Sequence, residues 1–145
     1  MKRISKDEYY LGIAMAVSKR STCLRRRYGA VIVTANDEIV ATGYNGAARR
    51  EPNCCDVFEE CPRKAMAHNS GDYSDCPAVH AEQNALLSAA RGELNGATLY
   101  LNGEEFGDST ITPMKECLPC PICGRMIRNS GILRVVGPQD IRKKG

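Results

Sequence analysis

The sequence contains no hydrophobic run long enough to cross a membrane, and it shows no secretory signal. No stretch of its 145 residues approaches the roughly 20 consecutive apolar residues that a transmembrane helix requires. Residues 1–10 read MKRISKDEYY, so the basic start is followed by polar residues and not by an apolar segment. We therefore expect a protein of the cytoplasm that works away from membranes.

Net charge is also low. Twenty basic and 17 acidic residues leave a formal charge of +3, which argues against the broad basic surface of a nucleic-acid-binding protein. The run Arg25-Arg26-Arg27 is a local concentration of positive charge in this otherwise balanced sequence. If it lies beside a pocket, its guanidinium groups can bind a phosphate through paired hydrogen bonds. At this length we expect residues 1–145 to form a single domain around one core.

Cysteine, in contrast, is abundant, with eight residues in the chain. In an oxidising compartment this number would predict disulfides. In the reducing compartment expected here, and with Cys120 and Cys123 separated by two residues, metal ligation is the favoured interpretation.

The most informative motif is His80-Ala81-Glu82, followed about forty residues later by Pro119-Cys120-Pro121-Ile122-Cys123. One imidazole and two thiolates suit zinc, and three protein ligands leave a fourth tetrahedral position open, as in catalytic zinc sites. Glu82 is close enough to act on a water at that position without binding the metal. This pattern, H-x-E and then P-C-x-x-C, is the signature of zinc-dependent nucleobase deaminases.

The motif therefore predicts hydrolysis of a cyclic amidine. Zinc lowers the pKa of a bound water to about 7, which makes a nucleophile available at neutral pH. Glu82 is predicted to carry protons, first to the ring nitrogen and then to the amino group that leaves as ammonia. The backbone of Ala81 and the region of Pro119 are predicted to contact the edge of the base.

Hydrophobic periodicity and turn signals predict an α/β protein. Ser5 and Glu8 form a capping box before the first helix. In order, we expect a helix over 6–20, a hairpin of strands 28–34 and 38–44, an irregular segment 45–77, a helix over 80–91 ended by Gly92, a strand over 97–102, a surface loop over 103–116, a helix over 120–129, a strand over 132–136 and a mobile tail over 137–145.

This order predicts a three-layer α/β/α sandwich around a mixed sheet of about five strands. The helices that begin at His80 and Cys120 would then present their N-termini to one site. Partial positive charge at a helix N-terminus lowers the pKa of a thiol, so we expect Cys120 and Cys123 to bind as thiolates.

Further segments resemble the deoxycytidylate (dCMP) deaminase family over about residues 5–136. They are Ser21-Thr22-Cys23-Leu24-Arg25, residues 29–33, Gly43-Tyr44-Asn45-Gly46, Asn53-Cys54, residues 80–85 and the Cys120/Cys123 pair. The resemblance implies a cytidine deaminase-like fold and hydrolysis of dCMP to dUMP and ammonia, which feeds thymidylate synthesis. It also implies that Asn45 contacts the sugar-phosphate and that Arg25 helps to bind the phosphate.

The resemblance implies a second, structural zinc as well. Its ligands would be Cys23, Cys54, Cys76 and either Cys61 or His68. It further implies a homohexamer that dCTP activates together with Mg²⁺ and that dTTP inhibits, through a site near Gly43–Gly46. The chain departs from the family pattern at residues 47–51, at Gln83 and in the longer segment 103–118.

Three alternatives remain open at this stage. The substrate could be dCTP or a 5-modified dCMP, or it could contain another base, such as free cytosine or a tRNA adenosine. The low net charge and the acidic segment 103–116 argue against a tRNA substrate. From a different class, the chain could be a non-catalytic module that zinc stabilises.

Overall fold

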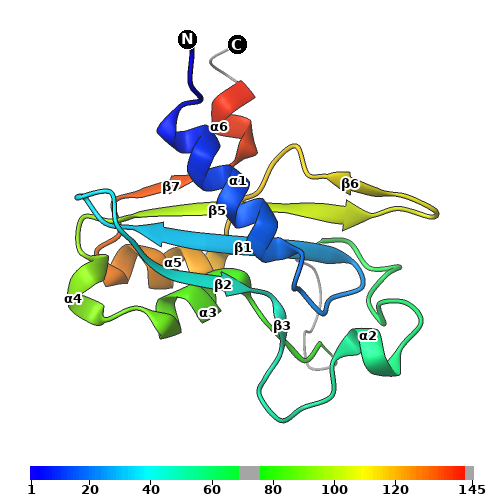
Figure 1. Ribbon diagram of the computed structural model, residues 1–145. Coiled ribbons are helices and arrows are strands. Elements are labelled where there is room, and N and C mark those ends of the chain that lie inside the picture. Colours follow the sequence, from blue (N-terminus) through cyan, green and yellow to red (C-terminus); the bar gives the residue numbers. More distant parts are fainter. Residues whose placement is uncertain (69–75, 143–145) are drawn as a thin grey trace.

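The computed structural model describes residues 1–68 and 76–142, which build a mixed sheet of five strands. The strand order is β2-β1-β5-β6, and β7 pairs with β5 as the sheet's parallel pair (Figure 1). The strands are β1 (Arg26–Val33), β2 (Ile39–Tyr44), β5 (Thr98–Phe106), β6 (Ile111–Pro113) and β7 (Arg134–Val136); β3 (Gly46–Ala47) and β4 (Ala78–Val79) pair separately.

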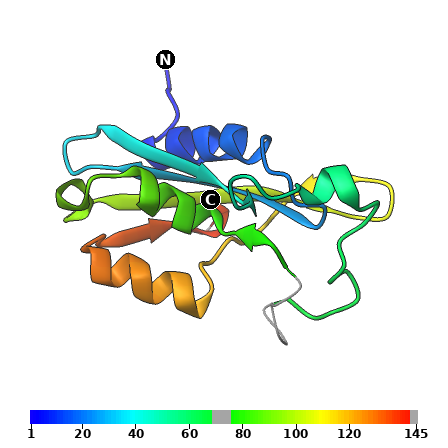
Figure 2. The same cartoon turned by 90° about the horizontal axis from the view of Figure 1, so that it is seen from below.

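Helices cover both faces of this sheet (Figure 2). One face carries α1 (Lys6–Ser18) and α6 (Pro138–Arg142), and the other carries α3 (Ala81–Ser88), α4 (Arg91–Leu94) and α5 (Pro121–Ser130). A separate cluster of buried apolar residues fills the space between the sheet and each helical layer. The predicted three-layer sandwich with a mixed five-stranded sheet is therefore confirmed.

The helices lie unusually close to the sheet at two glycines. A Cβ on Gly29 would lie 2.0 Å from the backbone oxygen of Ala14 in α1, and one on Gly43 would lie 2.4 Å from the backbone nitrogen of Ala85 in α3. Any side chain at Gly43 would push α3 away from β2. Glycine at this position therefore fixes where the N-terminal end of α3 lies.

The first helix and the first hairpin form as the sequence predicts. The Ser5 side chain accepts a hydrogen bond from the Glu8 backbone and caps α1. Strands β1 and β2 pair in antiparallel register across the turn at Asp37, whose φ is +63°. Among the residues that the structure describes, no helix combines the length and apolar character of a membrane-spanning segment.

The predicted helix over 80–91 is too long. Helix α3 ends at Ser88, and Ala89 adopts an extended conformation. A second short helix, α4, then starts, because the Glu93 side chain accepts a hydrogen bond from the Ala90 backbone. Gly92 lies within α4 and does not end a helix.

The predicted surface loop over 103–116 is also wrong. Strand β5 continues to Phe106 and forms an antiparallel hairpin with β6. Glu104 is only 5% exposed, and its carboxylate pairs with Lys19 and Arg27. These two cations, far away in the sequence, neutralise a charge that would otherwise oppose burial.

The predicted mobile tail begins as a helix, α6, over Pro138–Arg142, while residues 143–145 lie outside the described part of the chain. The Gln139 side chain bonds both backbone groups of Cys117, accepting from its N–H (3.0 Å) and donating to its carbonyl (3.2 Å). Gly137 leaves room for this contact, because a Cβ there would lie 2.7 Å from the Cys117 carbonyl oxygen.

Candidate active site

Three potential metal ligands meet where α3 and α5 begin. His80 is the N-cap residue of α3, and Cys120 is the N-cap residue of α5. The Nδ1 atom of His80 lies 3.7 Å from Sγ of Cys120 and 3.3 Å from Sγ of Cys123. A tetrahedral zinc with ordinary Zn–N and Zn–S bonds requires N–S separations of about 3.6 Å, so the three donors fit zinc.

Local hydrogen bonds hold the backbone of these residues. The Gln83 side chain accepts from the His80 backbone N–H at 2.8 Å, which closes the first turn of α3. Sγ of Cys120 accepts from the Cys123 backbone N–H at 3.4 Å, which closes the first turn of α5. Gln83 therefore orients the residue that carries the imidazole.

Glu82 lies beside this cluster and is almost fully buried, with 4% of its surface exposed. Burial raises the pKa of its carboxyl group, and this effect is opposed by a backbone N–H, by His80 and by Cys123. A carboxyl group with a raised pKa exchanges protons more readily near neutral pH. The arrangement thus suits proton transfer within a site that also holds metal-ligand side chains.

The electrostatics of Cys123 differ from the sequence-based expectation. Its side chain is fully buried, and burial, followed by the Glu82 charge and by Cys120, raises the pKa of the Cys123 thiol. Desolvation therefore outweighs the helix N-terminus at this residue. A cation at the cluster would supply the charge that stabilises the thiolate.

A cavity of about 110 Å³ opens onto the cluster. Its lining includes His80, Glu82 and Cys120 from the predicted centre and Arg25 and Asn45 from the predicted nucleotide contacts. Ala81 is buried, and neither it nor Pro119 belongs to the lining contributed by the described residues. Arg26, from the basic run noted in the sequence, also belongs to the lining, whereas sequence reasoning missed Tyr28 and considered His68 only as a zinc ligand.

The Asn45 side chain makes three hydrogen bonds to its own protein. Its Oδ1 accepts from the Ser21 hydroxyl (2.7 Å) and the Tyr28 backbone (2.8 Å), and its Nδ2 donates to the Arg26 carbonyl (2.8 Å). With 7% exposure, Asn45 holds the start of β1 against the loop after α1.

The Arg25 guanidinium donates to two backbone carbonyls, those of Arg63 and Met66. It therefore ties the segment after α2 (Cys54–Val57) to the edge of the cavity. Arg26, whose Nε donates to Glu105 at 2.8 Å, and His68 add basic side chains to the same lining.

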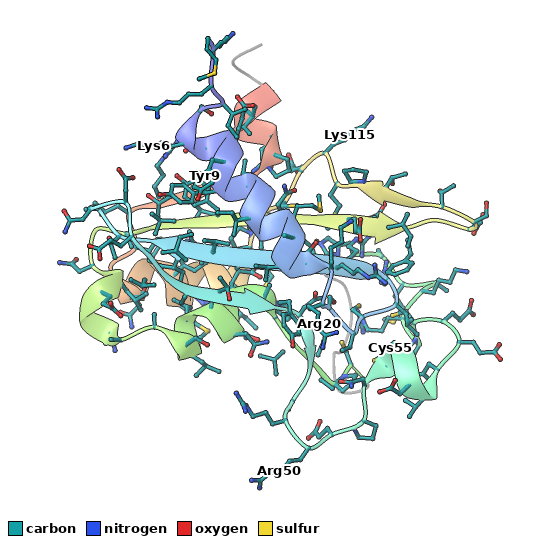
Figure 3. All side chains as sticks on the ribbon, viewed as in Figure 1. Lys6, Tyr9, Arg20, Arg50, Cys55 and Lys115 are labelled. Atoms are coloured by element: carbon teal, nitrogen blue, oxygen red, sulfur yellow. The ribbon has the colours of Figure 1, made fainter. Side chains whose placement is uncertain are left out.

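The remaining cysteines divide into two groups. Four of them, Cys23, Cys54, Cys61 and Cys76, line a second, smaller cavity. Burial and then Cys23, Cys76 and Cys61 raise the pKa of the Cys54 thiol, so these thiols are neighbours. Cys55 is exposed on α2 (Figure 3), and Cys117 is buried in the core.

The cysteine-lined cavity is looser than the first cluster. In residues 1–68 and 76–142, only His80, Cys120 and Cys123 bring three ligand atoms within 4.8 Å of one another. His68 lines the first cavity and Cys61 lines both, so Cys61 is better placed than His68 to join Cys23, Cys54 and Cys76.

The fold and the cluster together define an α/β domain with a zinc-type His-Cys-Cys centre beside a buried carboxylate. A family model, the cytidine and deoxycytidylate deaminase zinc-binding region, matches residues 4–137. The chain therefore belongs to this family of zinc-binding deaminases.

The chain is also similar to individual proteins that are named deoxycytidylate deaminases. The chain is 42% identical to the deoxycytidylate deaminase of Mycobacterium phage D29, over 97% of this chain and 99% of that protein. It is 38% identical to the Schizosaccharomyces pombe deoxycytidylate deaminase over 92% of its own length, but it spans only 37% of that longer protein. The crystal structure of cyanophage S-TIM5 dCMP deaminase in complex with dCMP and dUMP superposes with a TM-score of 0.64, at 28% identity, covering 93% of this chain and 83% of the other.

Proposed function

We propose that this chain, as a single deaminase domain, hydrolyses dCMP to dUMP and ammonia and so feeds thymidylate synthesis. The observation that carries the proposal is the buried carboxylate of Glu82 beside the His80, Cys120 and Cys123 cluster, inside a cavity. The similarity to the phage D29 protein, over nearly the full length of both chains, supports dCMP as the substrate.

In this proposal, Nδ1 of His80 and the Sγ atoms of Cys120 and Cys123 hold the zinc. When bound, zinc lowers the pKa of a coordinated water to about 7 and so makes a nucleophile available. Glu82 accepts a proton from the water as the water oxygen bonds to C4 of the cytosine, and it delivers this proton to N3. It then takes the proton of the new C4 hydroxyl and passes it to the 4-amino group, so that the C4–N bond breaks, ammonia leaves and the C4 carbonyl forms.

The basic part of the cavity lining is proposed to bind the 5′-phosphate. Arg25 keeps N–H groups beyond those that bond Arg63 and Met66, and Arg26 and His68 lie in the same lining. The second N–H of the Asn45 amide is proposed to reach the sugar. The backbones of Ala81 and Pro119, which flank the metal ligands, are proposed to contact the base edge.

Ammonia release from cytosine, cytidine, CMP, dCMP and dCTP tests this function. We expect dCMP to give the highest kcat/KM, and we expect Arg25→Ala to raise KM for nucleotides at least tenfold more than KM for cytidine, because one charge-assisted contact contributes about 1.5–3 kcal/mol. Equal losses on both substrate types would reject the phosphate role of Arg25. Preference for dCTP or for free cytosine would reject dCMP as the substrate.

We also propose a second, structural zinc held by Cys23, Cys54, Cys61 and Cys76. The lining of one small cavity by all four thiols supports this ligand set. Four thiolates would close a tetrahedral site and fasten the segment around α2 to the loop before β1.

If the second site exists, we expect elemental analysis to find about two zinc ions per chain in the wild type and about one in Cys54→Ala. We expect this variant to melt at a lower temperature, because the α2 segment loses its attachment. The matched control is Cys55→Ala, next in the chain and exposed, which should keep the wild-type zinc content. About one zinc in the wild-type chain would remove the hypothesis.

Regulation and assembly remain predictions. A surface hollow beside Gly46 is lined by Arg20, Ala47, Arg49 and Asn84, and we propose it as the place for a dCTP or dTTP effector with Mg²⁺; Arg20 is labelled in Figure 3. The homohexamer is proposed from the family resemblance alone, and the cytoplasmic location is proposed from the sequence alone.

A further inference from the structure

Tyr28 lies at the entry of strand β1 and lines the same cavity as His80 and Glu82. Side chains alternate along a strand, so Tyr28 shares a face with Ala30 and Ile32, which belong to the core beneath α3 and α5. Its ring packs against that core. Tyr28 thus brings an aromatic ring to the part of the cavity where Glu82 is buried.

The position of this ring is constrained. The Tyr28 backbone N–H donates to Asn45 Oδ1 at 2.8 Å, its carbonyl accepts from the Asn45 backbone at 3.4 Å, and in the sheet it pairs with Gly103. Because the backbone is held from both sides and the ring packs on a buried cluster, the side chain has little room to retreat from a ligand.

The Tyr28 side chain is partly buried, and it faces the cavity because it is one of the residues that line it. Burial, together with the charges of Cys117 and Glu82, raises the pKa of the hydroxyl, so it stays neutral. The ring therefore extends toward the reacting end of the cavity as an uncharged wall.

We propose that Tyr28 is a specificity-determining residue whose ring limits the size of the pyrimidine that the cavity accepts. The inference rests on the proposed deamination of dCMP and deepens it. In cytosine, C5 is the ring carbon beside C4, the carbon that loses its amino group. C5 and C6 are the ring carbons that can carry a substituent, and C5 is the one next to C4. A ring that lines the cavity with Glu82 leaves less room for a group on C5 than for the hydrogen of dCMP, so we expect the cavity to admit dCMP and to disfavour 5-modified dCMP.

The test compares binding of dCMP and 5-methyl-dCMP by calorimetry, in a Glu82→Gln background so that neither ligand is consumed. We expect dCMP to bind at least tenfold more tightly, in keeping with the roughly 10–200-fold discrimination that one carbon can provide in a fitted pocket. Tyr28→Val should reduce the difference to less than threefold by removing the ring. Tyr28→Phe, which keeps the ring, should preserve the difference.

Three outcomes would overturn the inference. They are equal binding of the two nucleotides by the parent protein, an unchanged ratio in Tyr28→Val, and loss of discrimination in Tyr28→Phe. If Tyr28→Val does not fold, Tyr28→Leu provides the same comparison with a larger side chain. Failure of both nucleotides to bind the parent would instead reject the proposed function, and the role of Tyr28 with it.

Discussion

Replacing Glu82 with glutamine is expected to lower kcat for dCMP by about 10²–10⁴-fold or more, while zinc content changes little. Glutamine has nearly the same shape but cannot accept or release the proton that the proposed reaction moves twice. Because the carboxyl group is buried and its pKa is raised, the amide also avoids a desolvation cost, so the melting temperature should not fall. Ammonia release, elemental analysis and thermal melting measure the three quantities.

Glu104 provides a matched control, since it is also a buried glutamate, at 5% exposure. Its carboxylate pairs with Lys19 and Arg27, and Lys19 first and then Arg27 hold the pKa of Glu104 low against the opposing effect of burial. Glu104→Gln should therefore lower stability and leave kcat nearly unchanged. Full activity in Glu82→Gln would contradict the mechanism, and a wild-type chain that releases no ammonia would favour a non-catalytic zinc module.

Replacing Cys120 with alanine is expected to remove one zinc per chain and to reduce activity below detection. Two of the three proposed ligands would remain, and the alanine could no longer accept the hydrogen bond from the Cys123 backbone that closes α5. Zinc content by elemental analysis and ammonia release from dCMP are the measurements. Excess zinc added to the assay should restore little activity, because two donors bind the ion weakly.

Cys117→Ala is the control for this experiment, because it removes a thiol three residues earlier in the same segment. Cys117 is 1% exposed, and burial, followed by Glu82, raises the pKa of its thiol to about 12, so it stays protonated. This variant should keep its zinc and its turnover, with some loss of stability from the smaller side chain. Loss of zinc in Cys117→Ala but not in Cys120→Ala would show that the ligand assignment is wrong.

The centre of the site was predictable because its signals are local. His80 and Glu82 lie two residues apart, so one short motif contains both the residue proposed to hold the metal and the residue proposed to move a proton beside it. Cys120 and Cys123 share one helical turn, and Pro121 and Gly131 mark the ends of their helix. The structure brings the ligand atoms of His80, Cys120 and Cys123 within 4.8 Å of one another.

What the sequence concealed depends on contacts between distant segments. Glu104 looked like part of a polar loop because Lys19 and Arg27, which neutralise it, lie far away in the chain. Gly92 looked like a helix terminator, but the bond between Glu93 and the Ala90 backbone starts a new helix around it. Tyr28 went unnoticed because only packing of the sheet against α3 brings it near Glu82.

The bond between Gln139 and the Cys117 backbone has a practical consequence. It couples the last helix of the chain to the residues that lead into Cys120, with Gly137 as the spacer that lets the two meet. We therefore expect a truncation of α6, or a fusion joined directly to it, to disturb the short stretch that leads into Cys120, one of the proposed zinc ligands.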